Sequence, residues 1–451
     1  MFKIPLMGPF LQAIYPKFDA YLAQWASGPL SCVSVFHKFV VLASDRDLAH
    51  KVFKSPTFTR PCLVPMAIEI MRPTAWVFLN GKAHAEFRRG LTGLFTNKAL
   101  SRYLPVQEKV YGDYFKKFVQ ASKENKGKPN VFMGWFREIN CALSCRTFFG
   151  DYISQEAVKR IADDFYLVTD ALDLVNVPLS IYIPFTKCWR GKRTADAVLA
   201  EFTKAAAAFD QWVEHMYEST KYNEAIAAGA EGIEKPTNLI REFTPEEIAQ
   251  TLFTFLFASQ DASSSATTWL FQILAQRPDV LDRLREENLA VRGGDKNRPF
   301  ELGMFESMTY THAVIKEVLR YRPPVIFVPY LATKAFPVTP NYTVPKNAMI
   351  VPSCYPALHD PVAYPNPDVF DPERWITGDA ETKTKNWLVF GAGAHDCIAR
   401  RYVPLTLAHM IGKASLEIDW VHHATSRSEE IRVFATLFPM DECPLVFTKR
   451  E

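Results

Sequence analysis

The stretch from Thr244 to Pro278 constrains the fold of this chain more than any other. Thr244 is a candidate N-cap, Pro245 suits the first helical position, and Glu247 three residues after Thr244 completes a capping box. A helix is therefore expected to begin here and to run to about Pro278, which makes it an unusually long one.

The middle of this predicted helix has an unusual composition. Residues 258–266, ASQDASSSA, are small and polar, and they lie between the apolar runs LFTFLF and WLFQIL. Serine is a weak helix former, so the run calls for an explanation. Either the small residues let the helix pack tightly on a neighbour, or they leave room for a flat ligand that Asp261 faces.

The remainder of the chain predicts a mainly α fold with small β-sheets. Residues 28–57 predict strands followed by a helix beginning at Asp45, and residues 81–290 are mainly helical, with the apolar stretch 177–185 as an interruption. After residue 320, dense prolines and short β-like runs predict edge strands and ordered loops. A helix is expected after Cys397, and strands are expected in the last 30 residues.

Nothing in the chain suggests a domain boundary. It has no long Gly/Ser linker, no charge block and no internal repeat, and its loosest stretch, 223–238, is interpreted as a long loop between helices. We therefore expect residues 1–451 to form a single domain. Hydrophobic residues make up 48%, and the 34 phenylalanines indicate either a large core or an apolar cavity.

Charge, cysteine usage and hydropathy limit the function classes. A net charge of +3 is too small to indicate a nucleic-acid partner, although it allows a basic face for an acidic protein. The eight cysteines are scattered, and Cys141 and Cys145 are interpreted as buried small residues, so a reducing compartment is expected. The longest apolar run is too short to span a membrane, so either the protein is soluble or an anchor has been trimmed from it.

Cys397 is the candidate for the chemistry. It follows the glycine-rich loop FGAGAHD and precedes an expected helix, where the field at the helix N-terminus favours a thiolate. Gly391 and Gly393 allow sharp turns that point N–H groups at the sulfur, and His395 can donate to an anionic group. These features suit a thiolate that binds haem iron, whereas most cysteines in proteins are only structural.

Three motifs in a fixed order resemble the cytochrome P-450 superfamily. Phe390, Gly393, His395 and Cys397 match its pattern F-x-x-G-x-(R/H)-x-C, and EVLR (317–320) and PERW (372–375) precede this pattern. The resemblance covers nearly the whole chain and implies a large helical lobe with a smaller β-rich lobe. It also implies haem b with Cys397 as the axial ligand of the iron, and a buried charge triad of Glu317, Arg320 and Arg374. The loop residues Phe390, Gly391, Gly393 and His395 would contact the haem.

Further stretches of the sequence narrow the resemblance within the superfamily. GKAHAEFRR (81–89) looks like the helix over the haem edge, where His84 and Arg88 would bind a propionate. FLFASQDASSSATTWLFQILAQRPDVL and NWLVFGAG resemble the fungal sterol C-22 desaturases. Most superfamily members carry threonine directly after the acid of the long helix; Ala262 and Ser263 stand there instead, as in the desaturase group.

Four residues that follow the cysteine depart from that pattern. Ala399 replaces an expected glycine, and it fits at little cost if its φ is negative. Arg400 and Arg401 also differ from the desaturase group. Pro404 costs about 3 kcal/mol if the helix begins at Ile398, but is tolerated if regular helix begins nearer Tyr402.

The resemblance implies an oxidase that receives electrons from NADPH through a flavoprotein, NADPH–cytochrome P-450 reductase. Asp261 and Ser263 would relay protons, and hydrogen would be lost from C-22 and C-23 of a sterol, leaving the C22–C23 double bond found in ergosterol. The implied location is the cytosolic face of the endoplasmic reticulum membrane, with contact to the membrane surface. The residues expected to line the sterol pocket are Trp76, Phe78, Phe253, Phe257, Ala258, Val325, Phe327, Leu437 and Phe438.

Two alternatives remain open. One is another sterol or lipid monooxygenase of the same fold, either a hydroxylase or a 14α-demethylase. The other is a sterol-binding protein with weakened catalysis, which the departures Ala399, Arg400 and Pro404 motivate.

Overall fold

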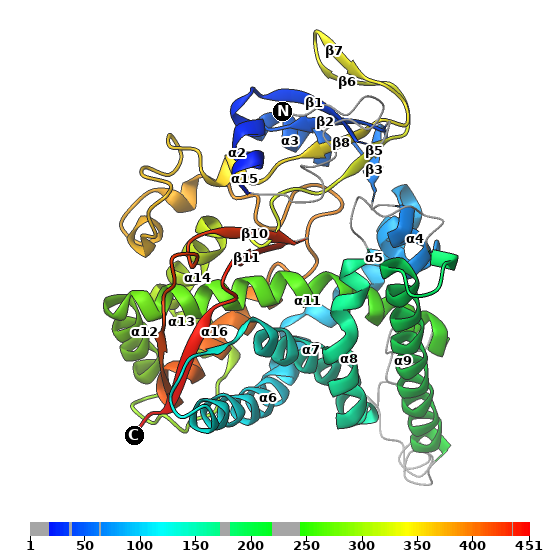
Figure 1. Ribbon diagram of the computed structural model, residues 1–451. Coiled ribbons are helices and arrows are strands. Elements are labelled where there is room, and N and C mark those ends of the chain that lie inside the picture. Colours follow the sequence, from blue (N-terminus) through cyan, green and yellow to red (C-terminus); the bar gives the residue numbers. More distant parts are fainter. Residues whose placement is uncertain (1–17, 36–37, 63–64, 172–180, 219–243, 435) are drawn as a thin grey trace, which may run out of the picture.

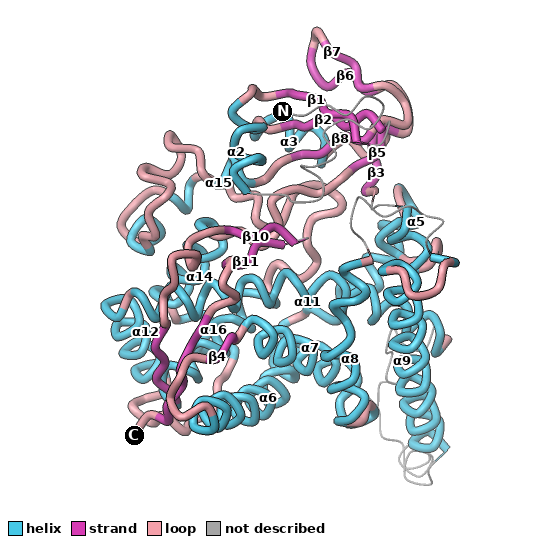
Figure 2. The backbone as a smooth tube through the Cα atoms, viewed as in Figure 1, coloured by secondary structure: helices cyan, strands magenta, loops and turns pink. Residues whose placement is uncertain are grey.

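The computed structural model describes residues 18–35, 38–62, 65–171, 181–218, 244–434 and 436–451. Helices form a large lobe, and short strands gather mainly in a smaller lobe around the N-terminal part of the chain (Figures 1 and 2). The predicted fold class, mainly α with small β-sheets, is confirmed. The predicted loop 223–238 and residues 177–180 of the interruption 177–185 lie outside the described residues.

Helix α11 (Pro245–Gln276) crosses the helical lobe and contacts elements on several sides (Figure 1). The capping box at its start is present, because the Thr244 side chain accepts from the N–H of Glu247 while Glu247 accepts from the N–H of Thr244. The predicted start is therefore confirmed, and the helix ends two residues before Pro278. It packs against α7 (Met133–Phe149), α9 (Lys187–Glu218), α14 (Thr309–Tyr321) and strand β11 (Thr436–Pro439), and Gln260, Asp261 and residues 264–266 of its small polar middle are buried.

The other helices precede or follow α11 in the chain. On its N-terminal side in sequence lie α2 (Phe18–Ala26), α3 (Arg46–Phe53), α4 (Pro65–Met71), α5 (Gly81–Leu91), α6 (Asn97–Glu124), α7 (Met133–Phe149), α8 (Gln155–Asp170) and α9 (Lys187–Glu218). After it come α12 (Pro278–Val291), α13 (Leu302–Ser307), α14 (Thr309–Tyr321), α15 (Tyr355–Leu358) and α16 (Tyr402–Glu417).

The largest sheet has five strands in the order β1–β2–β8–β5–β3. Strands β1 (Leu30–Val35) and β2 (Lys38–Ala43) form a hairpin, and β2 pairs in parallel with β8 (Met349–Pro352), which brings the N-terminal part of the chain beside residues 349–352. The other strands of this sheet are β3 (Thr59–Pro61) and β5 (Tyr330–Ala332). Three smaller sheets contain β6 (Phe336–Thr339) with β7 (Tyr342–Val344), β10 (Ile431–Phe434) with β11 (Thr436–Pro439), and β4 (Asn130–Val131), β12 (Pro444–Lys449) and β9 (Ile418–His422).

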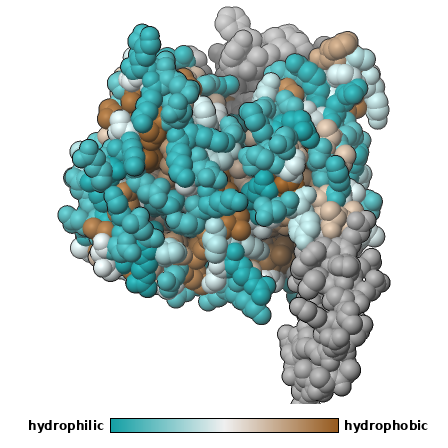
Figure 3. All heavy atoms as spheres, turned by 90° about the horizontal axis from the view of Figure 1, so that it is seen from below, coloured by the Kyte–Doolittle hydropathy of each residue, from teal (hydrophilic) through white to brown (hydrophobic). Residues whose placement is uncertain are grey.

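Phenylalanine serves mainly as core in this protein. Phe118, Phe132, Phe136, Phe271 and Phe447 touch one another ring to ring where α6, α7, α11 and β12 meet, and each of them is at most 1% exposed. On the face shown in Figure 3, hydrophilic residues predominate and hydrophobic ones are scattered among them. The aromatic side chains thus supply the apolar burial that holds the helical lobe together.

Candidate active site

The loop before Cys397 is held by its glycines and by backbone hydrogen bonds. Gly391 and Gly393 have φ of 66° and 79°, in the left-handed region that favours glycine. A Cβ on Gly393 would collide with the backbone oxygen of Phe53 on α3. The N–H of Cys397 donates to the carbonyl oxygen of Phe390 at 2.9 Å, which closes the loop and fixes the position of the cysteine.

Cys397 is a free thiol with exposed surface, although protein atoms crowd around the sulfur. This burial raises the pKa of the thiol, and the backbone N–H of Ala399 partly opposes the increase. The N–H of Gly391 donates to the backbone oxygen of Leu388, so it is not one of the N–H groups that the turn points at the sulfur. A metal cation bound to the sulfur would remove the proton despite the raised pKa.

The departures after Cys397 are accommodated in the backbone. Residues 398–401 form turns, and α16 begins at Tyr402 with Arg401 as its N-cap, so the helix does not follow Cys397 directly. Pro404 is then the third helical residue, where an N–H has no intrahelical partner to lose. Ala399 is not among the described residues with positive φ, so its methyl group adds no backbone strain.

Arg88 ties the helix α5 to the cysteine loop. One of its nitrogens donates to the backbone oxygen of Asp396 and another to the carboxylate of the same residue, both at 2.6 Å. Arg400 donates to the second carboxylate oxygen of Asp396 at 3.0 Å. Asp396 therefore lies between two arginines, directly before Cys397.

His84 and His395 meet beside this ion pair, with ring centroids 3.8 Å apart. Burial and the neighbouring Arg88 lower the pKa of His84, and burial, His84 and Arg88 lower the pKa of His395 to about 4, so both rings are neutral at pH 7. Trp76, expected at the sterol, stacks on His84 with the ring planes 17° apart. Nε2 of His84 and Nε1 of Trp76 are buried and have no hydrogen-bond partner in the described part of the chain.

These residues fit a haem. Cys397 is an accessible thiol, and Nε2 of His84, which is buried without a partner among the described residues, lies on α5, the helix that Arg88 joins to the cysteine loop. Nε1 of Trp76, which also lacks a partner there, lies in the short turn before that helix. Carboxylates such as haem propionates are acceptors that would satisfy both nitrogens.

Asp261 on α11 faces the helices α7 and α8. Its Oδ1 lies 2.6 Å from Nη1 of Arg137, and its Oδ2 accepts from the Thr169 hydroxyl at 2.7 Å. Burial raises the pKa of Asp261, while Arg137 and Thr169 oppose the increase. Ser263, the other expected relay residue, is partly exposed, whereas Asp261 is buried.

One face of α11 is open at the small residues. Ala258 is exposed, and Ala262 and Ser263 are partly exposed, although their neighbours Gln260, Ser264 and Ser265 are buried. Of the two interpretations of this run, tight packing describes the buried serines, whereas the alanines at i and i+4 leave one stripe of the helix uncovered.

The other expected pocket residues are scattered in their burial. Phe253, Leu437 and Phe438 are fully buried, and Phe438 lines a surface cleft beside Arg137. Partly buried are Phe78, Phe257, Val325 and Phe327. The structure therefore does not bring the nine residues into one described cavity.

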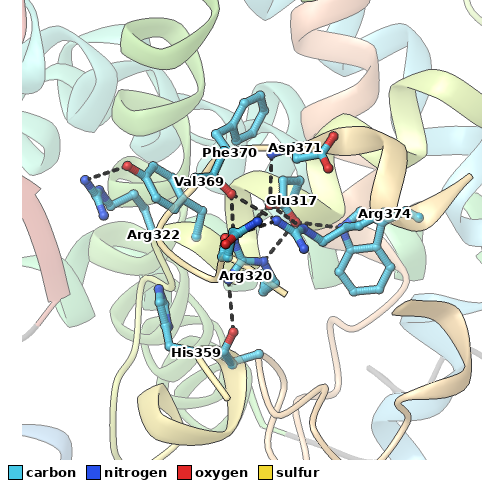
Figure 4. A network of polar contacts seen from close by, with 12 residues as sticks. Glu317, Arg320, Arg322, His359, Val369, Phe370, Asp371 and Arg374 are labelled. Atoms are coloured by element: carbon cyan, nitrogen blue, oxygen red, sulfur yellow. Dashed lines mark hydrogen bonds and ion pairs between the residues drawn. The ribbon is translucent and has the colours of Figure 1, made fainter. Parts of the chain in front are cut away.

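The predicted triad comes together in the structure (Figure 4). Glu317 accepts from Arg320 at 2.8 and 2.9 Å and from Arg374 at 2.9 Å. It also accepts from the Trp375 indole at 2.8 Å and from the N–H of Asp371 at 3.1 Å. Both arginines donate further to backbone oxygens, so this buried cluster is well satisfied and joins α14 to the segment 358–375.

Sequence reasoning missed three residues at the site: Asp396, Arg137 and Thr169. Asp396 lies inside the quoted loop, and its position beside Cys397 was a usable signal. Arg137 and Thr169 lie within ordinary helices, and no local pattern distinguishes them, because their partner Asp261 is 124 and 92 residues away in sequence.

Comparison with known proteins agrees with this geometry. The family model of cytochrome P-450 matches residues 2–423. The chain is 78% identical to the C-22 sterol desaturase ERG5B of Gibberella zeae, over 100% of this chain and 87% of the relative. It is 74% identical to the cytochrome P-450 monooxygenase oblE of Emericella variicolor, over 99% of this chain and 87% of the relative.

Two further comparisons extend the range. The C-22 sterol desaturase ERG5 of Saccharomyces cerevisiae is 52% identical, over 99% of this chain and 84% of the relative. Among solved structures, a cyanobacterial CYP120A1 with bound retinoic acid aligns with a TM-score of 0.82 at 19% identity, covering 100% of this chain and 98% of that one. With the cysteine loop, the triad and the whole-chain match in agreement, this chain belongs to the cytochrome P-450 family.

Proposed function

We propose that this protein is a haem-thiolate sterol C-22 desaturase that introduces the C22–C23 double bond of ergosterol. The observation that carries the proposal is the 78% identity over the whole chain to a C-22 sterol desaturase, together with an intact cysteine loop. Ala262 and Ser263 after Asp261 add to it, because a desaturase pattern replaces the usual threonine there.

In this proposal, haem b is held by Cys397 at the iron and by the His84, Arg88 and His395 group at the propionates. Trp76 joins that group as a further N–H donor, since its indole nitrogen is buried without a partner beside His84. The bound haem supplies oxygen activation with electrons delivered from NADPH. The loop residues Phe390, Gly391 and Gly393 hold Cys397 in place, through the bond from the Cys397 N–H to Phe390 and the close approach of Gly393 to α3.

Asp261 and Ser263 pass protons to the reaction in this scheme, because Ala262 has no group that can carry one. The raised pKa of Asp261 suits a carboxyl that must take up and release a proton. The side chains of Ala258 and Ala262 are short, so one stripe of α11 leaves space for a sterol side chain to approach the haem.

We further propose NADPH–cytochrome P-450 reductase as the electron donor and the endoplasmic reticulum membrane as the location. No helix among the described residues is long and apolar enough to cross a bilayer. Membrane contact is instead supported by an exposed aromatic and basic segment before and within α9. Tyr182, Ile183 and Phe185 are exposed, and the Arg193 guanidinium lies 4.9 Å from the Trp189 ring centroid.

The test is a product assay with the reconstituted enzyme. The holoenzyme, reductase, NADPH and a 22,23-saturated sterol should yield the 22-ene. A stable alcohol as the only product would identify a hydroxylase instead, and loss of the 14α-methyl group would identify a demethylase.

One observation favours a second candidate function, oxidation of a lipid other than the sterol. A relative that is 74% identical is named only as a monooxygenase, so a high identity leaves the substrate open to another lipid. If the sterol gives no product, turnover of other lipids by the same reconstituted enzyme separates this candidate from a protein whose catalysis has weakened.

A further inference from the structure

A cleft of about 610 Å³ opens between α7, α8 and the C-terminal strands. Its rim is formed by exposed residues, among them Val131, Asp163 and Tyr166. Its inner wall includes Arg137 and Phe438, which are 8% and 1% exposed. The cleft therefore leads from the molecular surface to the buried guanidinium that pairs with Asp261, and it is large enough to hold many waters.

The Arg137–Asp261 pair is close but incompletely hydrogen-bonded. Nη1 of Arg137 lies 2.6 Å from Oδ1 of Asp261, yet this oxygen receives no hydrogen bond of good geometry, and Nη2 of Arg137 has no partner in the described part of the chain. Buried charged atoms of this kind are normally satisfied, by water where protein groups fail. Water from the cleft is the nearest available source of such contacts.

The backbone around the pair is firmly held. Gln260, which precedes Asp261, donates from its side chain to the backbone oxygen of Arg137 at 2.7 Å. The Thr169 hydroxyl fixes the other carboxylate oxygen of Asp261. The position of Arg137 on α7 thus determines how its side chain reaches Asp261. The Arg137 side chain separates the Asp261 carboxyl from the cleft.

The cleft also acts on Asp261 electrostatically. Asp170, which lines the cleft, adds to the effect of burial in raising the pKa of Asp261, against the opposing effect of Arg137 and Thr169. A change of charge at the cleft wall therefore also acts on this carboxyl.

We propose that Arg137 is a positioning residue for the Asp261 carboxyl, and that the cleft which Arg137 lines is the route by which solvent protons reach this carboxyl. A proton passes from cleft water to a carboxylate oxygen of Asp261, and the carboxyl later releases it toward Ser263, so that the carboxylate is restored after each transfer. Arg137 keeps its charge and its proton throughout. The inference rests on the proposed relay role of Asp261.

The first experiment replaces the guanidinium. Arg137→Ala should lower the ratio of 22-ene formed to NADPH consumed on the order of tenfold, less than the roughly 100-fold loss expected from removing the relay acid itself. Because the cleft reaches the vacated position, millimolar ethylguanidinium should restore this ratio in part and should also raise the melting temperature of Arg137→Ala. Neither effect should occur in wild type or in Arg137→Ala/Asp261→Asn.

The second experiment narrows the cleft. Ala162, on α8, lines the cleft. Ala162→Trp should enlarge the solvent deuterium isotope effect on turnover by about twofold or more, which is within the range that proton transfer contributes to catalysis. The sterol-binding spectrum of this variant should stay unchanged. Ala197→Trp on α9 is the matched control, since Ala197 is exposed and does not line the cleft. Combined with Arg137→Ala, Ala162→Trp should abolish the melting-temperature shift by ethylguanidinium.

Each outcome decides. Full coupling in Arg137→Ala would overturn the positioning role, and a missing melting-temperature shift with ethylguanidinium would overturn the access route. If Arg137→Ala does not fold, Arg137→Lys keeps the charge but loses the planar fork, and it should fold with reduced coupling. Failure of wild type to form the 22-ene would count against the proposed function alone, because the melting-temperature test needs no turnover.

Discussion

Two nitrogens of Arg88 donate to Asp396, the residue directly before Cys397, both at 2.6 Å. The helix that carries His84 is thereby joined to the loop that carries the proposed iron ligand. Arg88 lies three-quarters or more buried in this contact, and its partner Asp396 also pairs with Arg400. The ion pair thus couples the proposed propionate end of the site to the sulfur end.

Arg88→Ala should therefore reduce haem retention as well as haem affinity, because the loop loses its anchor to α5. We expect the haem content per purified chain to fall several-fold, measured by pyridine haemochrome absorbance against protein concentration. The neighbouring Arg89→Ala is the control, since Arg89 is exposed. An equal loss in both variants would contradict a specific role for the Arg88–Asp396 contact.

Cys397→Ser should abolish the thiolate-type spectrum of the carbonyl complex, because a hydroxyl is a far weaker donor to iron than a thiolate. Difference spectra of the reduced protein with carbon monoxide measure this directly. Cys354→Ser is the control, since Cys354 is buried in the small lobe. An unchanged spectrum for Cys397→Ser would rule out this cysteine as the ligand.

Asp261→Asn should separate oxygen consumption from product formation while the sterol still binds. The amide keeps the shape of the carboxyl but cannot carry the proton, so reduced oxygen should leave as peroxide. Peroxide release, NADPH use and 22-ene formation are measured together. Full, coupled turnover in this variant would remove Asp261 from the relay.

Local patterns predicted those features whose determinants lie close together in sequence. Thr244 and Glu247 specify the start of α11 within four residues, and the triad could be predicted because three motifs recur in a fixed order. The start of α16 could not be predicted from a local pattern, because it depends on whether the residues after Cys397 form turns or helix. Pro404 is compatible with a helix that begins at Tyr402, as observed.

Contacts between distant helices were out of reach of such patterns. Arg137 and Thr169 meet Asp261 only because α7 and α8 pack on α11, and neither residue has a neighbour in sequence that marks it. For the same reason the pocket candidates could be placed on elements but not in a common cavity. The sequence likewise gave no sign that Trp76 would stack on His84.

Glu317→Gln should destabilise the protein strongly. Glu317, Arg320 and Arg374 are at most 8% exposed, and loss of the carboxylate charge leaves two buried guanidinium groups uncompensated. Breaking a buried pair in this way costs about 3–5 kcal/mol. Denaturant titration measures the loss, and Glu301→Gln at the exposed Arg298–Glu301 pair should change stability by about 0.5 kcal/mol or less. Similar losses in the two variants would contradict the triad's structural role.

His359 should make the protein sensitive to acid. Burial and the neighbouring Arg320 lower the pKa of His359 to about 3, well below its ordinary value (Figure 4). The unfolded chain therefore binds the proton more tightly than the folded one. Stability is complete above about pH 6.5 and falls by about 1.4 kcal/mol per pH unit below it, until the pH approaches the folded value.

The measurement is the free energy of unfolding between pH 7 and pH 4 for wild type and for His359→Gln. Glutamine loses the stacking on Tyr355, whose ring centroid lies 3.8 Å away, so the variant is weaker at pH 7. Its slope with pH should nevertheless be shallower, because one titrating group is gone. Other buried histidines contribute equally to both proteins, so parallel slopes would show that His359 is not the source.

Pro404→Ala should leave the protein almost unchanged. Pro404 is the third residue of α16, and an N–H at that position has no partner within the helix, so alanine gains no hydrogen bond. We expect the free energy of unfolding to stay within about 0.5 kcal/mol of the wild-type value. The haem content should equal that of wild type within experimental error. Ala408→Pro, in the buried interior of the same helix, should cost about 3 kcal/mol or more because it removes a hydrogen bond and introduces a clash. A gain of more than about 2 kcal/mol in Pro404→Ala would mean that the proline strains a helix that otherwise begins at Ile398, and that the loop after Cys397 departs from the family in structure as well as in sequence.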